Sequence, residues 1–148
     1  MRVFPGGKYT LPSRPGECRV LCWGGMSKAK ILIVDDDAKL STLMRAFLEC
    51  DGFEVREENR SFAAYSTARE FRPQLILLDV DMPGKDGGTV AAEIAADPAL
   101  APTPIIFVTS LVSRGESGMR GKERFLGKPV APTELLTAVR QALPRVAA

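Results

Sequence analysis

The sequence has no histidine and only three cysteines. The cysteines are Cys18, Cys22 and Cys50 in a chain of 148 residues. Structural zinc sites combine four cysteine or histidine ligands, and no histidine is present to complete one beside Cys18 and Cys22. An odd number of cysteines also lacks the pattern of a disulfide framework. We therefore expect no zinc site and predict reduced thiols, as in a cytoplasmic protein.

Long apolar runs and clusters of basic residues are missing too. No apolar run approaches the ~20 residues that a membrane-spanning helix requires. The net charge is +2, and the excess of positive charge lies in residues 1–25, which leaves the remainder slightly acidic. Because a nucleic-acid-binding surface needs clustered lysine and arginine, we predict neither a nucleic-acid partner nor a membrane partner. The 148 residues, 45% of them hydrophobic, suit one globular domain with a single core.

The first 26 residues differ from the rest of the chain in composition. They are rich in proline and glycine and follow neither the period of a strand nor that of a helix. They also lack the continuous apolar core of a secretory signal. A second methionine, Met26, directly precedes the stretch SKAKILIVDDD, which contains the first strand-like run. We therefore expect residues 1–26 to form an extension, either disordered or upstream of the true start, and residues 27–148 to form the folded domain.

Short strand-like runs alternate with helical patterns from residue 28 onwards. The runs lie at 30–34, 53–57, 75–80, 104–110 and 124–129. Strands that are apolar throughout are typical of a parallel sheet covered by helices on both faces, so we predict an α/β fold. Three glycines between residues 111 and 123 disfavour a helix before the last strand, and we expect that helix to be short, displaced or mobile. Thr133 is the predicted cap of the final helix.

Polar residues follow the runs at the positions where the strands end. They are Asp35, Asp36, Asp79, Asp81, Thr109, Ser110 and Lys128. The carboxyl ends of parallel strands form the functional edge of such a sheet. Carboxylates only a few Å apart stay ionised when a cation joins them, and Mg²⁺ prefers such oxygen ligands. With a lysine as a fixed positive charge, this combination suits phosphoryl transfer to an aspartate.

Four motifs in this order resemble the receiver domain of two-component response regulators. They are ILIVDDD, LILLDVDMPGKDG, IIFVTS and FLGKP, within roughly residues 28–143. The resemblance implies a flavodoxin-like, doubly wound sheet of five parallel strands in the order 2-1-3-4-5. It implies that Asp79 is the phosphoacceptor and binds Mg²⁺ together with Asp35 and Asp36. It further implies that Asp81 gives the metal its backbone carbonyl and that Lys128 pairs with the phosphoryl group.

Two further residues resemble the conformational switch of that family. Thr109 matches the hydroxyl that moves to the phosphoryl group, and Phe125 matches the rotating aromatic residue, with a plain core role as the alternative. Pro129 follows as the family's cis proline. Asp37 is more typical of a helix N-cap than of a metal ligand. Gly88 departs from the family, which has an apolar residue at that place.

The function expected from this resemblance is that of a stand-alone receiver. It would accept a phosphoryl group on Asp79 from a phosphohistidine donor in a Mg²⁺-dependent reaction and signal to a partner through the switch. Because the chain has no histidine, the donor is expected to be a sensor histidine kinase or a histidine phosphotransfer protein; the output protein is unknown. We expect no DNA-binding domain after the last helix. We predict a signalling domain with slow autodephosphorylation rather than an enzyme.

Two other functions remain as alternatives. A phosphatase of the haloacid dehalogenase type also uses an aspartyl phosphate and Mg²⁺, and LLDVDM resembles its nucleophile motif. That family places the motif on its first strand, however, and Pro83 stands where it has threonine or valine. The second alternative is a receiver fold that docks partners without taking phosphate, which the complete set of acids, threonine and lysine disfavours.

Overall fold

The computed structural model describes residues 2–3, 10–11, 28–110, 118–120, 123–128 and 130–143. Within the predicted extension, β1 (Arg2–Val3) and β2 (Thr10–Leu11) form an antiparallel pair. The other residues of that extension lie outside the described part, so the boundary at residue 26 stays a prediction.

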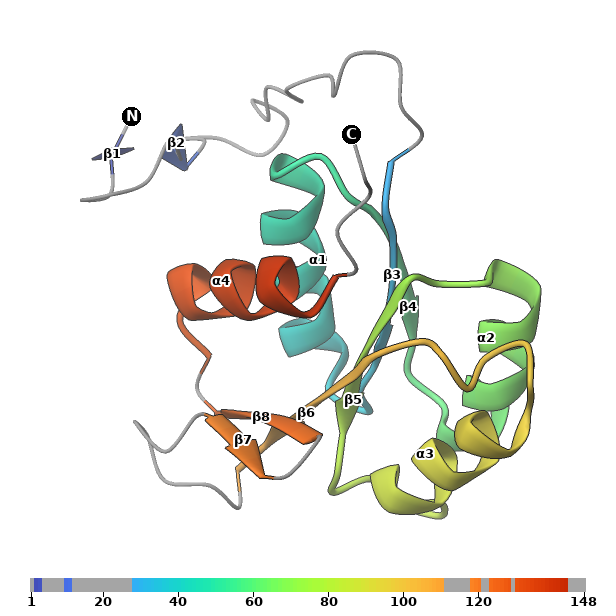
Figure 1. Cartoon of the computed structure of the whole chain (residues 1–148). Helices are drawn as coiled ribbons and strands as arrows, with labels where there is room; N and C mark the ends of the chain where they lie inside the picture. Colours follow the sequence, from blue (N-terminus) through green and yellow to red (C-terminus); the bar gives the residue numbers. More distant parts are fainter. Residues whose placement is uncertain are drawn as a thin grey trace.

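One six-stranded sheet forms the centre of the domain (Figure 1). Its parallel strands are β3 (Lys30–Val34), β4 (Glu54–Glu58), β5 (Leu75–Asp79), β6 (Ile105–Thr109) and β8 (Glu123–Gly127). They lie in the order β4-β3-β5-β6-β8, followed at one edge by β7 (Gly118–Arg120), which is antiparallel to β8. The five parallel strands therefore confirm the predicted order 2-1-3-4-5.

Strand β7 lies within the segment for which a weak fourth helix was predicted. Residues 118–120 form a strand, so the expectation of a helix is wrong for these three residues. Glycine has low helix propensity, and β7 pairs antiparallel with β8 from Gly118↔Phe125 to Arg120↔Glu123. Pairing with the edge of β8 satisfies the backbone groups of this segment that a helix would have satisfied internally.

Helices cover both faces of the sheet (Figure 1). Helices α1 (Ala38–Cys50) and α4 (Pro132–Ala142) pack on one face, and α2 (Ala64–Phe71) and α3 (Gly87–Ala96) pack on the other. Successive strand residues point to opposite faces. In β3, for example, Ile31 and Ile33 belong to the core under α1 and α4, whereas Leu32 and Val34 belong to the core under α2 and α3. The predicted doubly wound fold is confirmed.

Of the two N-caps that the sequence predicted, that of α1 is confirmed and that of α4 is wrong. Asp37 caps α1, because its side chain accepts hydrogen bonds from the backbone N–H groups of Lys39 and Leu40. The predicted cap of α4 at Thr133 is wrong, since Ala131 is the N-cap residue and Pro132 occupies the first turn. Proline lacks an N–H donor and has a fixed φ, so it starts a helix without a side-chain cap.

Two expectations drawn from missing sequence features can be compared with the structure. Cys50, at the end of α1, is disulfide-bonded, so the prediction of reduced thiols is wrong at this position. Among the residues that the structure describes, none of the helices has the length and apolar character needed to cross a bilayer.

Candidate functional site

Three carboxylates meet at the edge of the sheet where the parallel strands end. Asp35 directly follows β3 and Asp79 ends β5, and these strands are neighbours in the sheet. Asp35 and Asp79 are 1% and 3% exposed, whereas Asp36 lies on the surface. One oxygen from each of the three carboxylates lies within 4.8 Å of the others. The fold thus brings together the acids that the sequence singled out.

Lys128 places a positive charge between the two buried carboxylates. Its Nζ lies 3.1 Å from Asp35 Oδ2 and 3.4 Å from Asp79 Oδ1. The backbone N–H of Lys128 donates to the carbonyl of Thr109 at 2.9 Å, which fixes the end of β8 against β6. Burial acts to lower the pKa of Lys128, but the carboxylates of Asp35 and Asp79 outweigh burial and raise it. The lysine therefore stays charged at neutral pH.

The carboxyl group of Asp79 is held in an environment that opposes ionisation. Burial and then the charge of Asp35 raise its pKa to about 7, although Lys128 and a hydrogen bond from the backbone N–H of Asp81 oppose the rise. That hydrogen bond joins Asp81 N to Asp79 Oδ1 at 3.3 Å. One lysine is thus insufficient to balance the cluster, and a further cation beside it would favour the ionised form.

Asp35 offers an oxygen for such a cation. Its Oδ1 accepts a hydrogen bond from the backbone N–H of Asp37 at 2.9 Å. Its Oδ2 is buried and accepts no hydrogen bond from the described residues; the 3.1 Å approach of Lys128 Nζ is an ion pair without hydrogen-bond geometry. Carboxylate oxygens are the ligands that Mg²⁺ prefers. The donor set of Asp35, Asp36 and Asp79 therefore fits a divalent cation of this kind.

The other predicted site residues lie around this cluster. Asp81 is exposed, and Thr109 is buried at the end of β6, the strand beside Asp79. Phe125 is partly buried in β8 and its ring stacks on Phe107, with centroids 5.3 Å apart and planes at 22°. Pro129, predicted as a cis proline, lies outside the described residues.

Asn59 belongs to the site and was missed by the sequence reasoning. Its side-chain amide donates to the backbone carbonyl of Asp35 at 2.7 Å and to Ser41 Oγ at 2.9 Å. Ser41, fully buried in α1, in turn donates to Glu57 at 2.7 Å. Asn59 thereby ties the end of β4 to the turn that carries the acids. It is the first polar residue after β4, so extending the survey of strand ends to that edge strand would have found it.

Ser61 holds the loop after Asp79 in place through hydrogen bonds, as Asn59 holds the turn after β3. Its hydroxyl donates to the carbonyl of Pro83 at 3.1 Å and accepts from the backbone N–H of Lys85 at 3.3 Å. The side chain is buried, in the short 3₁₀ helix η1 (Ser61–Ala63). No sequence motif pointed to this residue, because its two partners lie more than twenty positions away along the chain.

Replacing Asn59 by alanine is expected to weaken Mg²⁺ binding. The carbonyl of Asp35 would lose its donor, which costs about 1–2 kcal/mol in the free energy of unfolding, and the turn that orients the acids would loosen. Removing such a supporting contact lowers metal affinity about tenfold. Calorimetric Mg²⁺ titration and urea denaturation measure both effects. The exposed neighbour Arg60, replaced by alanine, is the control and should change Mg²⁺ affinity less than twofold; equal affinities of both variants would contradict the role of Asn59.

Residues 31–140 match the family model described as the response regulator receiver domain. The transcriptional regulatory protein ResD of Bacillus subtilis is 34% identical over 125 residues, which cover 80% of this chain and 50% of ResD. The DNA-binding response regulator MtrA of Mycobacterium tuberculosis is 32% identical over 121 residues, which cover 80% of this chain and 52% of MtrA. The chain thus spans about half the length of these two relatives.

Solved structures agree with this match. The chemotaxis response regulator CheY4 of Vibrio cholerae aligns with a TM-score of 0.69 and 26% identity over 79% of this chain and 100% of CheY4. The receiver domain of the sensor histidine kinase PA1611 of Pseudomonas aeruginosa, solved with a magnesium ion in its active-site cleft, aligns with a TM-score of 0.68 and 27% identity over 78% of this chain and 98% of that domain. With its sheet order and the family match over most of its length, this chain belongs to the response regulator receiver domain family of two-component signalling.

Proposed function

We propose that this chain is a stand-alone receiver that accepts a phosphoryl group on Asp79 and passes the signal to a partner protein. Response regulators receive phosphate from histidine kinases, and receiver domains are in general signalling domains rather than enzymes. The observation that carries the proposal is the position of Asp79, buried at the end of β5 between two acids and Lys128. Asp79 would act as the nucleophile beside Lys128, and Asp35 and Asp36 would hold Mg²⁺, which would supply further positive charge to the site.

In the proposed reaction Asp79 acts as the nucleophile. A carboxylate oxygen attacks phosphorus, the new O–P bond forms as the P–N bond of the phosphohistidine breaks, and the imidazole nitrogen keeps the electron pair. The Asp79 oxygen Oδ1 is held by Asp81 N–H at 3.3 Å and Lys128 at 3.4 Å, which orients the carboxylate for in-line attack. Asp35 and Asp36 would hold Mg²⁺, which supplies charge neutralisation of the phosphoryl oxygens when bound.

The donor of the phosphoryl group is proposed from the sequence. Because these 148 residues contain no histidine, the phosphohistidine lies outside them, and we propose a sensor histidine kinase or a histidine phosphotransfer protein as the donor. The absence of a nucleic-acid partner stays a prediction, since MtrA is a DNA-binding response regulator and this chain covers 52% of it. A cytoplasmic location and a start at Met26 stay predictions as well.

We propose that the signal leaves the site through Thr109 and Phe125. Lys128 N–H is bonded to the Thr109 carbonyl, and β6 pairs with β8 from Ile106↔Arg124 to Thr109↔Gly127. A shift of the Thr109 hydroxyl toward a phosphoryl group would therefore be transmitted to the strand that carries Phe125. The stacked pair of Phe107 and Phe125 couples this strand to the core under α2 and α3. Such a change is a shift between two populations of one fold.

The switch predicts a localised response to beryllofluoride, a mimic of the phosphoryl group. In the presence of Mg²⁺, amide chemical shifts around residues 109 and 125–128 are expected to change, because Thr109 and Lys128 reorient. Two-dimensional NMR of the protein with and without beryllofluoride measures this. Identical spectra in this region, with changes confined to Asp35, Asp36 and Asp79, would contradict the proposed switch.

The proposed function is tested by incubating the protein with Mg²⁺ and acetyl phosphate. We expect one phosphoryl group per chain, stable in acid and labile in base, detected by intact-protein mass spectrometry and absent when EDTA replaces Mg²⁺. A phosphatase would instead hydrolyse phosphoesters repeatedly, and a docking module would show neither behaviour. Either of these results would replace the proposed function.

A further inference from the structure

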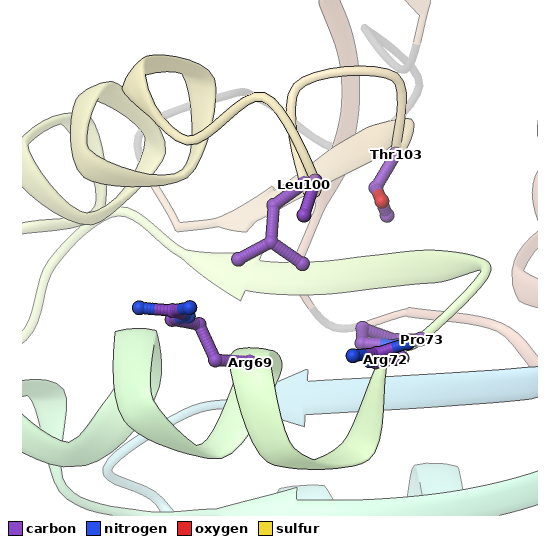
Figure 2. A pocket seen from close by; sticks show the side chains of 6 residues that line it. Arg69, Arg72, Pro73, Leu100 and Thr103 are labelled. Atoms are coloured by element: carbon purple, nitrogen blue, oxygen red, sulfur yellow. The ribbon is translucent and has the colours of Figure 1, made fainter.

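A cavity of about 290 Å³ lies at the edge of the sheet where β5 and β6 begin, opposite the acid cluster at which they end. It is lined by Arg69, Arg72, Pro73, Ala99, Leu100 and Thr103. Figure 2 shows Leu100 and Thr103 projecting from the loop before β6 toward the end of α2, where Arg69 lies in the helix and Arg72 directly follows it. The walls thus combine positive charge, a hydroxyl group and three apolar side chains.

The charges at this cavity do not balance. Arg69 Nε lies 3.5 Å from Asp97 Oδ2, which also accepts a hydrogen bond from the hydroxyl of Tyr65 at 2.8 Å. Arg72 is exposed, and its guanidinium makes no ion pair or hydrogen bond with the described residues. Asp97 therefore offsets one arginine, and one positive charge is left without a counter-charge at the cavity.

Arg72 ends α2 in a left-handed conformation, and its backbone N–H donates to the carbonyl of Ala68 at 2.9 Å. Its φ is 52°, the one positive φ of a non-glycine residue in the described part of the chain. A left-handed residue is common directly after a helix, but glycine or asparagine is favoured there. The following residue is Pro73, which pushes its predecessor toward extended conformations. Strain of this kind concentrates at functional sites, and here it occurs at the wall of a cavity.

We propose that this cavity binds a small molecule that carries one phosphate or carboxylate group on a compact apolar body. The free guanidinium of Arg72 would take the oxyanion in a bidentate contact, with the hydroxyl of Thr103 nearby. Pro73, Ala99 and Leu100 would contact the apolar body. The volume of about 290 Å³ lies just below the range of about 300–1,000 Å³ that is typical of ligand pockets, which restricts the ligand to a small molecule. This site is separate from Asp79, so it stands or falls independently of the proposed phosphorylation.

Phenylphosphonate and benzoate are suitable probes for the two oxyanions. The titration is done in EDTA, so that no metal draws the anion to the acid cluster, and binding is followed by amide chemical shifts. We expect saturable shifts at residues 69, 72, 100 and 103 with a dissociation constant on the order of 1 mM for at least one probe; which probe binds more tightly identifies the oxyanion. Benzyl alcohol and methylphosphonate, which lack the charge and the ring respectively, should bind at least about threefold more weakly. Absence of saturable shifts at these residues with both probes would overturn the proposal.

The variant Arg72→Gly distinguishes the contribution of the Arg72 side chain to ligand binding from the backbone strain at this position. Glycine adopts positive φ without a steric penalty, so the melting temperature without ligand should rise, whereas affinity for the probe should fall at least about tenfold. Lys39→Ala, which removes one exposed charge at the start of α1, is the control and should leave the affinity unchanged. A lower melting temperature of Arg72→Gly would overturn the argument from strain, and unchanged affinity would overturn the site.

Discussion

Replacing Asp79 by asparagine is expected to abolish phosphoryl uptake and to stabilise the metal-free protein. The carboxyl group ionises at about pH 4 in an unfolded chain, but burial and the neighbouring Asp35 raise its pKa to about 7 in the folded protein. Ionisation therefore lowers the stability progressively between these two values and is fully unfavourable above them. Asparagine fills nearly the same volume without a charge, so the variant escapes this penalty.

The stability difference between Asp79→Asn and the wild type should follow pH. It is expected to be close to zero at about pH 4 and on the order of 2–4 kcal/mol at about pH 8, measured by urea denaturation in EDTA. Saturating Mg²⁺ should shrink the difference, because the cation stabilises the ionised wild-type cluster. Asp81→Asn removes an exposed carboxylate two residues away and should show no such trend. A difference that is flat across this pH range would contradict the electrostatic description of the site.

Replacing Gly87 by alanine is expected to destabilise the protein by about 2–3 kcal/mol through overpacking. Gly87 begins α3 directly beneath the site, and a Cβ atom there would lie 2.4 Å from the carbonyl oxygen of Asp79 and 2.8 Å from the Cα of Val80. Both atoms belong to the backbone, so no side-chain rotation relieves the clash. The displaced end of β5 carries the carboxylate, and the rate of phosphorylation should fall together with stability.

The adjacent Gly88 provides a matched control. A Cβ atom at this position would meet only the Asp86 side chain, at 3.4 Å. Alanine is favoured over glycine within a helix by about 0.5–1 kcal/mol, so Gly88→Ala should stabilise the protein slightly. Urea denaturation of both variants gives the comparison. Equal effects of the two substitutions would show that helix propensity rather than the close approach to Asp79 governs this position.

The strands and the acid cluster could be predicted because their signals are local. The run at 30–34 coincides with β3, and the acid that follows it must lie at the carboxyl edge of a parallel sheet. Asp35, Asp79 and Lys128 could therefore be placed together without knowledge of any contact between them. The cap at Asp37 was predictable for the same reason, since its partners lie two and three residues away.

Features that depend on partners far away along the chain could not be predicted from the local sequence. Asn59 reaches a carbonyl 24 residues away, and Ser61 bonds a loop 22 residues away. The glycines disfavour a helix at 118–120, but the strand itself forms by pairing with β8. The predicted cap at Thr133 failed because Pro132 already fixes the start of α4. Residues of these kinds are determined by tertiary structure, which overrides local preference.

Asp79, and no other residue, is expected to accept the phosphoryl group. Borohydride reduction of an aspartyl phosphate leaves homoserine at the modified position, and peptide mass spectrometry then locates it. After incubation with Mg²⁺ and acetyl phosphate, we predict homoserine at position 79 in the wild type and at no position when EDTA replaces Mg²⁺. Homoserine at position 35, 36 or 81 instead of 79, or its absence despite bound Mg²⁺, would contradict the account.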